Sequence, residues 1–121
     1  MRGGDLSNQL APYVGIRFER IIKTDEGQLN RSAKAYMERI LGKEVNLVVI
    51  SNDKRKALAF LTKWHIPYTQ VLQADSRFEI PRLCQEWKLI SYFDVDPDTI
   101  QDVNSLSRET VAQLWESYEV A

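Results

Sequence analysis

Apolar and polar positions change pattern in blocks along the chain. In residues 13–22, YVGIRFERII, the two kinds alternate as in a half-buried strand. In residues 45–50, VNLVVI, β-branched residues run almost without interruption, which is typical of a central parallel strand covered on both faces. Shorter apolar runs in YTQVLQ (68–73) and LISYF (89–93) resemble two further strands. The pattern therefore predicts four strands.

Helical spacing of apolar residues fills the intervals between these strands. The first helix is preceded by Asn30 and Ser32, both good N-cap residues, and ends at Gly42. The second follows the capping residues Ser51–Asp53 and stops before Pro67. Three more helices are predicted in FEIPRLCQEWK (78–88), DTIQDV (98–103) and ETVAQLWESY (109–118).

Strands that alternate with helices require right-handed crossovers, and these place helices on both faces of a parallel sheet. The fold class is therefore α/β: a three-layer Rossmann-like domain with a mainly parallel central sheet. Residues 1–11 are polar, contain two glycines and are expected to form a flexible N-terminal lead-in. Residues 12–121 are expected to form a single domain.

Composition narrows the function classes. Of the 121 residues, 44% are hydrophobic and 27% charged, and the formal net charge is −1, so there is no strong nucleic-acid signal. No apolar run approaches the roughly 20 residues that span a bilayer, and the N-terminus has no signal-peptide core, so we expect no membrane and a cytoplasmic location. Cys84 is the only cysteine, which excludes an intrachain disulfide.

Polar residues follow the predicted strands at the edge where parallel sheets bind ligands. Ser51 and Asn52 follow VNLVVI, Arg77 follows the third strand, and Asp94 and Asp96 follow LISYF. A hydroxyl, several carboxylates and arginines at one edge suit a phosphate group or a hydrated Mg²⁺, which prefers oxygen ligands.

At these positions the chain resembles the haloacid dehalogenase (HAD) superfamily of Mg²⁺-dependent phosphohydrolases. In VVISND, Ser51 matches the hydroxyl that binds the phosphoryl group, and Arg77 matches the basic residue. In ISYFDVDP, Asp94 matches the metal-binding acid, with Asp96 or Asp98 as the second acid. The resemblance covers roughly residues 13–105 and leaves no room for a cap domain.

The chain departs from the family in VGIRFERII. Arg17 stands where the resemblance implies the nucleophilic aspartate, and Glu19 stands at the general acid. A guanidinium is always protonated and has no nucleophilic lone pair, so Arg17 cannot form an acyl-phosphate. We expect Arg17 to form a salt bridge with Asp94 across adjacent strands and to fill the metal position with its own positive charge.

The sequence therefore predicts a catalytically degenerate HAD-like domain that acts as a binding or regulatory module for an unknown protein or phosphorylated ligand. The alternative is an active Mg²⁺-dependent phosphatase or nucleotidase, in which Asp94, Asp96 or Glu19 takes over as nucleophile or base. A receiver-type phospho-acceptor domain is a third interpretation, which Arg17 disfavours. No cofactor is expected in the degenerate case, and Mg²⁺ in the active one.

Several of these residues also have structural explanations. Asp96, Pro97 and Asp98 form a good helix start, with an N-cap, a proline and an acid at the helix dipole. The apolar face that includes Trp115 and Tyr118 fits either core packing or a homo-oligomer interface. Each of these alternatives is open at the level of sequence.

Overall fold

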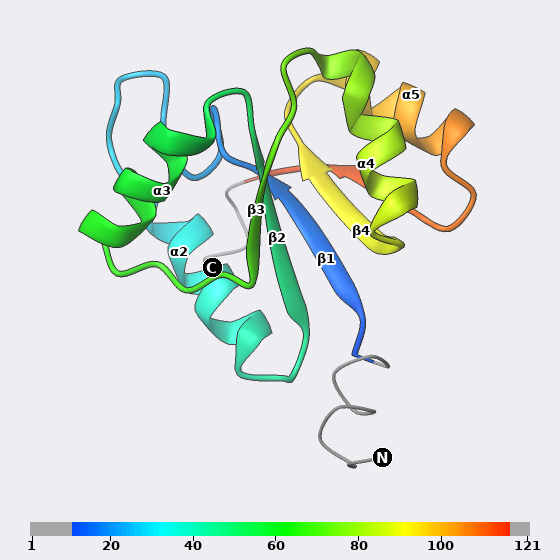
Figure 1. Cartoon of the computed structure of the whole chain (residues 1–121). Helices are drawn as coiled ribbons and strands as arrows, with labels where there is room; N and C mark the ends of the chain where they lie inside the picture. The colour runs from blue at the N-terminus through cyan, green and yellow to red at the C-terminus, as the bar shows by residue number, and fades with distance from the viewer. Residues whose placement is uncertain (1–10, 117–121) are drawn as a thin grey trace.

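The computed structural model describes residues 11–116, which contain one five-stranded sheet. Neighbouring strands all pair in parallel, in the spatial order β3-β2-β1-β4-β5 (Figure 1). The strands are β1 (Tyr13–Arg17), β2 (Asn46–Ser51), β3 (Gln70–Gln73), β4 (Leu89–Asp94) and β5 (Val111–Leu114). The predicted parallel sheet is confirmed. The predicted lead-in lies outside the described residues, except for Ala11.

Helices cover both faces of this sheet. On one face lie α2 (Arg31–Leu41) and α3 (Lys54–Lys63), and on the other lie α4 (Ile80–Glu86) and α5 (Pro97–Leu106) (Figure 1). A short 3-10 helix, η1 (Arg77–Glu79), leads into α4. The three-layer Rossmann-like architecture is confirmed. Within residues 11–116, no helix has the length and apolar character that crossing a bilayer requires.

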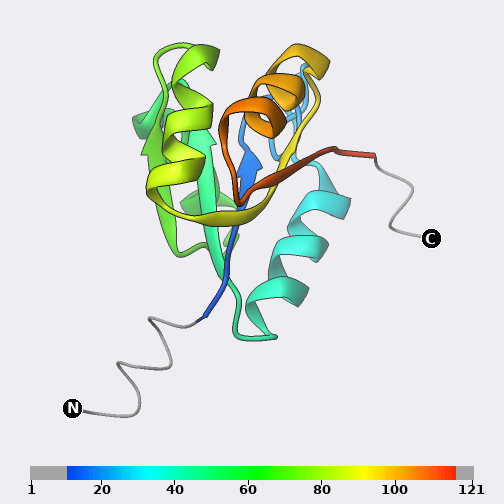
Figure 2. The ribbon, with the colours of Figure 1, turned by 90° about the vertical axis from the view of Figure 1, so that its right-hand side faces the viewer.

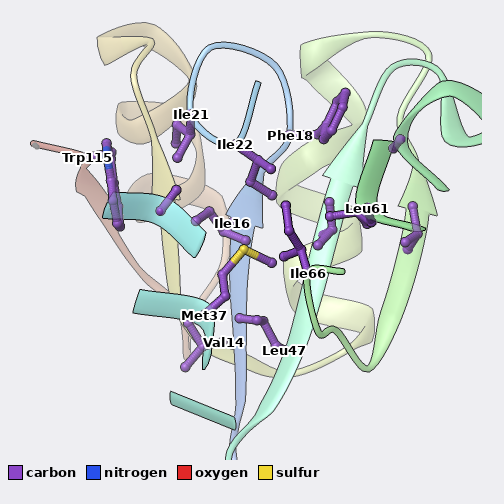
Figure 3. Close-up of a cluster of buried hydrophobic side chains, with 14 residues drawn as sticks. Val14, Ile16, Phe18, Ile21, Ile22, Met37, Leu47, Leu61, Ile66 and Trp115 are labelled. Carbon is purple, nitrogen blue, oxygen red and sulfur yellow. The ribbon is translucent and has the colours of Figure 1, made fainter. Parts of the chain in front are cut away.

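Strand β2 contributes side chains to both core layers. Leu47 and Val49 pack with α2 and α3, whereas Val48 and Ile50 pack with α4 and α5. All four side chains are fully buried. Figure 3 shows the first of these layers, with Leu47 among side chains from both helices. Burial on both faces explains why this strand is apolar at nearly every position.

The helix starts follow from local hydrogen bonds. Asn30 caps α2, and its side-chain oxygen accepts a hydrogen bond from the N–H of Ser32, while Gly42 is the C-cap. Asp53 caps α3 through a hydrogen bond from the N–H of Lys56. These side chains satisfy backbone donors that the first turn of a helix leaves unpaired. The sequence prediction of these two helices is confirmed.

Side chains of β4 leave little room at Gly15 of β1. A Cβ atom at this position would lie 2.6 Å from Leu89 Cδ1 and 3.1 Å from Tyr92 Cδ1. A larger residue would therefore have to displace these side chains.

The first strand is shorter than predicted. The alternating pattern suggested a strand to Ile22, but β1 ends at Arg17 and a tight turn follows. The N–H groups of Ile22 and Lys23 both donate to the carbonyl of Phe18, and Arg20 adopts a left-handed φ of 70°. The turn buries Phe18, Ile21 and Ile22, and these apolar residues resemble the continuation of a strand in the sequence.

The predicted last helix is wrong, because residues 111–114 form the edge strand β5. The chain passes from α5, orange in Figure 2, directly into this red strand. Hydrogen bonds from Thr110 Oγ1 to the Leu89 carbonyl and from the Trp115 N–H to the Asp94 carbonyl hold it against β4. Trp115 is buried in an aromatic cluster with Tyr36, so its predicted core role is confirmed. Tyr118 lies outside the described residues.

Candidate functional site

The predicted site residues meet at the carboxyl ends of three neighbouring strands. Arg17 ends β1, Ser51 ends β2 and Asp94 ends β4. Since β1 lies between β2 and β4, these three side chains share one edge of the sheet. Glu19 and Asn52 follow immediately in the loops after β1 and β2. The fold therefore assembles five of the eight predicted site residues.

Arg17 and Asp94 form an ion pair across β1 and β4. Arg17 Nη1 lies 3.1 Å from Asp94 Oδ2, and the exposed fractions of the two side chains are 19% and 0%. Although burial disfavours the charged guanidinium, the neighbouring Asp94 carboxylate raises the pKa of Arg17 above its usual value. The salt bridge predicted from sequence is confirmed.

Both oxygens of Asp94 have further hydrogen bonds. The Tyr92 hydroxyl donates to Oδ2 at 2.6 Å, while the N–H groups of Val95 and Asp96 donate to Oδ1 at 2.6 and 3.0 Å. Burial, and then the nearby Asp94 carboxylate, raises the pKa of Tyr92 well above its usual value, so this phenol remains a donor. Asp94 is thus a buried carboxylate with every lone-pair direction directed at a protein donor.

Glu19 continues this network toward β2. Its Oε1 accepts a hydrogen bond from Arg17 Nε at 3.1 Å, and its Oε2 accepts from Ser51 Oγ at 2.6 Å and from the Asn52 N–H at 3.1 Å. We call these three donors, the guanidinium, the hydroxyl and the backbone N–H, the anion cradle. Such a set suits any oxyanion, and here it holds a carboxylate of the same chain.

Ser51 and Asn52 are not the caps of α3. That role belongs to Asp53, as described above, although Ser51 Oγ also accepts a hydrogen bond from the Asp53 N–H at 2.9 Å. Ser51 is fully buried, and its Oγ lies 2.6 Å from Glu19 Oε2 and 3.1 Å from the Asp53 carbonyl. The Ser51 hydroxyl and the Asn52 N–H thus both contact Glu19 of the same chain.

Arg77 lies near the cradle on a neighbouring segment. It pairs with Asp102 at 3.3 Å and packs its guanidinium against the exposed ring of Phe78. A small cavity of about 90 Å³ has Arg77, Arg17, Ser51, Asn52 and Ser76 among the residues that line it. The predicted basic residue and the predicted phosphate-binding residues thus border one space.

A larger hollow of about 310 Å³ lies on the other side of Asn52. Its charged lining consists of three cations and three carboxylates: Arg20, Lys23, Lys56, Glu19, Asp25 and Asp53. We call it the loop hollow. Arg20 lies 3.7 Å from Asp25, so part of this charge is already paired.

Asp96 and Asp98 serve the start of α5. The Asp96 carboxylate is the N-cap and accepts hydrogen bonds from the Asp98 N–H at 3.1 Å and from Thr99 Oγ1 at 2.8 Å. The hydrogen bond from Thr99 lowers the pKa of Asp96. Asp98 is exposed in the first turn, where an acid is favourable at the helix dipole. The capping alternative is confirmed for Asp96.

This arrangement does not fit Mg²⁺. Mg²⁺ is usually bound by one or two carboxylates with free oxygens, whereas the Asp94 oxygens are occupied by Arg17 and other donors, and the Asp96 oxygens cap a helix. In the part of the chain that the structure describes, no group of three or more His, Cys, Asp or Glu residues could hold a metal ion. The metal assignment of Asp94, Asp96 and Asp98 stays a prediction.

Tyr92 is a site residue that the sequence reasoning missed. It belongs to the apolar run LISYF and stands two residues before Asp94 in β4. Side chains two apart in a strand point to the same face, so this spacing placed the phenol beside the carboxylate. The period of the strand could have revealed the contact.

Comparisons with known proteins concern the fold. No protein-family model matches the chain. No curated protein matches its sequence. A solved chain from the "Structure of the Pnkp1/Rnl/Hen1 RNA repair complex" superposes with a TM-score of 0.59 at 15% identity, over 89% of this chain and 44% of that one. This chain thus spans less than half the length of its structural neighbour. The match supports an α/β fold with a parallel sheet.

Proposed function

We propose that the chain is a catalytically degenerate, HAD-like domain that binds a phosphorylated ligand and acts as a binding or regulatory module. The observation that carries the proposal is the ion pair of Arg17 and Asp94. In the HAD superfamily that the chain resembles, these two positions are those of the nucleophile and of a metal ligand. Here they hold a cation and its counter-charge.

The chemical argument begins with Arg17. Phosphoryl transfer to the protein needs an oxygen nucleophile at the end of β1, and a guanidinium offers no lone pair for attack. The same group neutralises Asp94, which removes the charge that would otherwise attract a metal ion. The loss of the nucleophile and the loss of metal attraction both follow from the single residue Arg17.

Binding of a phosphate group is supported by the hydrogen-bond donors at the carboxyl end of β2. These are the Ser51 hydroxyl and the Asn52 N–H, which contact Glu19, while Arg17 and Arg77 border the adjoining cavity. Hydrogen bonds between guanidinium groups and phosphate oxygens are charge-assisted and stronger than neutral ones. This set of donors favours a phosphorylated ligand over a protein surface that lacks an oxyanion.

Two measurements test the loss of catalysis. The native chain is assayed over a broad phosphoester panel with and without Mg²⁺, and thermal unfolding is followed during a Mg²⁺ titration. We expect no turnover and no Mg²⁺ effect on the native chain. Arg17→Asp should gain Mg²⁺-dependent stability, about 2.7 kcal/mol at a hundredfold excess over Kd.

Lys54→Ala is the control, because it removes an exposed cation at the start of α3 that does not line the cradle or the small cavity. Mg²⁺-dependent turnover by the native chain, lost in Asp94→Asn and kept in Lys54→Ala, would overturn the proposal in favour of a HAD-type phosphatase or nucleotidase. The receiver-type interpretation would require phosphorylation of the chain itself by a small phosphodonor.

A further inference from the structure

The anion cradle is already occupied. Glu19 brings a negative carboxylate to the Arg17 guanidinium, the Ser51 hydroxyl and the Asn52 N–H, at 3.1, 2.6 and 3.1 Å. A phosphate oxygen that binds these donors must lie where the carboxylate oxygens now lie. Two anions cannot share one set of donors, because each would lose hydrogen bonds and repel the other.

Glu19 also has a second environment within reach. It lines the loop hollow, and Asn52 lines both this hollow and the small cavity. The Glu19 side chain is 24% exposed, so it is not locked in the core. A rotation away from the Asn52 N–H would bring the carboxylate into water.

We propose that Glu19 is a built-in competitor of the ligand: a phosphate group binds by displacing the Glu19 carboxylate from Ser51 and Asn52 toward solvent. This inference rests on the proposed function, because it assumes that the cradle receives a phosphorylated ligand. It adds that the cradle is self-occupied and that binding is an exchange of one anion for another.

The geometry explains why such a competitor stabilises the unliganded protein. Ser51 is fully buried and Arg17 mostly so, and a buried donor without a partner costs free energy. Glu19 satisfies these donors until a ligand replaces it. The same contact lowers the apparent affinity for the ligand, because the state that can bind is only a fraction of the population.

The test is titration of inorganic phosphate into the full chain, followed by calorimetry and by the ³¹P resonance. Five proteins are compared: the native chain, Glu19→Ala, Glu19→Gln, Glu109→Ala and the double variant Glu19→Ala/Ser51→Ala. Glu109 is the matched control, since it carries the same charge but lies before β5, at the amino ends of the strands and away from the cradle. Thermal unfolding of each variant verifies that it is folded.

We expect Glu19→Ala to bind phosphate about tenfold more tightly than the native chain or Glu109→Ala, which corresponds to roughly 1.4 kcal/mol. Glu19→Gln keeps the bulk of the side chain and loses the charge, so its affinity for phosphate should lie between those of the native chain and Glu19→Ala. Adding Ser51→Ala to Glu19→Ala should abolish the gain, because it removes a cradle donor. Glu19→Gln also provides the comparison if Glu19→Ala does not fold.

The outcomes separate the two proposals. The native chain and both Glu19 variants could bind phosphate with equal affinity, in a way that still needs Ser51. This result would overturn the competitor role of Glu19 and leave the phosphate-binding function intact. Absence of binding in every variant would overturn the phosphate-binding function, and the competitor with it. A gain in Glu19→Ala that persists without Ser51 would place the phosphate outside the cradle and contradict the exchange.

Discussion

The Tyr92 hydroxyl donates a 2.6 Å hydrogen bond to Asp94, and both side chains are fully buried. This contact anchors the carboxylate that pairs with Arg17, so it fixes the position of the ion pair at the sheet edge. Tyr92→Phe removes only the hydroxyl and leaves a buried carboxylate oxygen with one donor fewer. We expect the free energy of unfolding to fall by about 1–3 kcal/mol, measured by urea denaturation.

Tyr13→Phe is the control for this prediction, because Tyr13 is only half-buried and packs edge-on against Trp87. Its loss of a hydroxyl should change stability by much less. Equal effects of the two substitutions would mean that the bond to Asp94 contributes nothing beyond removal of a phenol.

The buried side chains of Leu89 and Tyr92 leave little room for a side chain at Gly15. Gly15→Ala should lower the free energy of unfolding by about 1–3 kcal/mol, since the new methyl group would collide with Leu89 Cδ1 at 2.6 Å. Gly42→Ala is the matched control: it has a helical φ of −67°, and its Cβ would meet ordinary contacts at 3.5 Å. A Gly15 variant as stable as the Gly42 variant would show that the Leu89 side chain can move aside at no cost.

The buried thiol of Cys84 predicts a dependence of stability on pH. Burial, and then the nearby Asp94 carboxylate, raises the pKa of Cys84 to about 12 from an ordinary value of 9.0. The folded state therefore favours the protonated thiol. Its contribution is fully present below pH 9 and is lost as the pH rises toward 12, because the unfolded chain then releases the proton first. Urea denaturation between pH 8 and 11 should show a steeper loss of stability for the native chain than for Cys84→Ala. Parallel slopes would contradict this.

The capping role of Asp96 predicts a stability effect that Mg²⁺ does not change. Asp96→Ala should lower the free energy of unfolding by about 1 kcal/mol, as loss of an N-cap does, whereas Asp98→Ala should have a smaller effect. Both are measured by thermal unfolding with and without Mg²⁺. If Mg²⁺ stabilises the native chain and this effect disappears in Asp96→Ala, then the carboxylate is a metal ligand and the capping explanation is incomplete.

Sequence alone predicted most of the layered fold. The β-branched run in β2 and the caps Asn30 and Asp53 are local signals, and the structure agrees with them. The ion pair of Arg17 and Asp94 was also predictable, because both residues follow apolar strands that the topology makes neighbours. These features depend on short stretches of sequence or on a general rule of parallel sheets.

The errors arose where distant contacts determine the local structure. Residues 111–114 show helical spacing, yet pairing with β4 and hydrogen bonds from Thr110 and Ala112 make them a strand. The turn after Arg17 was predicted as strand because Phe18, Ile21 and Ile22 are apolar, yet all three pack into one core layer from a turn. The role of Glu19 was likewise invisible, since its partners Ser51 and Asn52 lie more than 30 residues away. No local pattern encodes these contacts.

The ion pair at the end of β1 has a consequence for how the protein responds to its surroundings. In a metal-dependent site, charge balance comes from solution and varies with ion supply and with chelators. Here the compensating charge for Asp94 is encoded in the polypeptide as Arg17. The charge of Asp94 is therefore compensated as soon as the chain folds, by a residue of the same polypeptide.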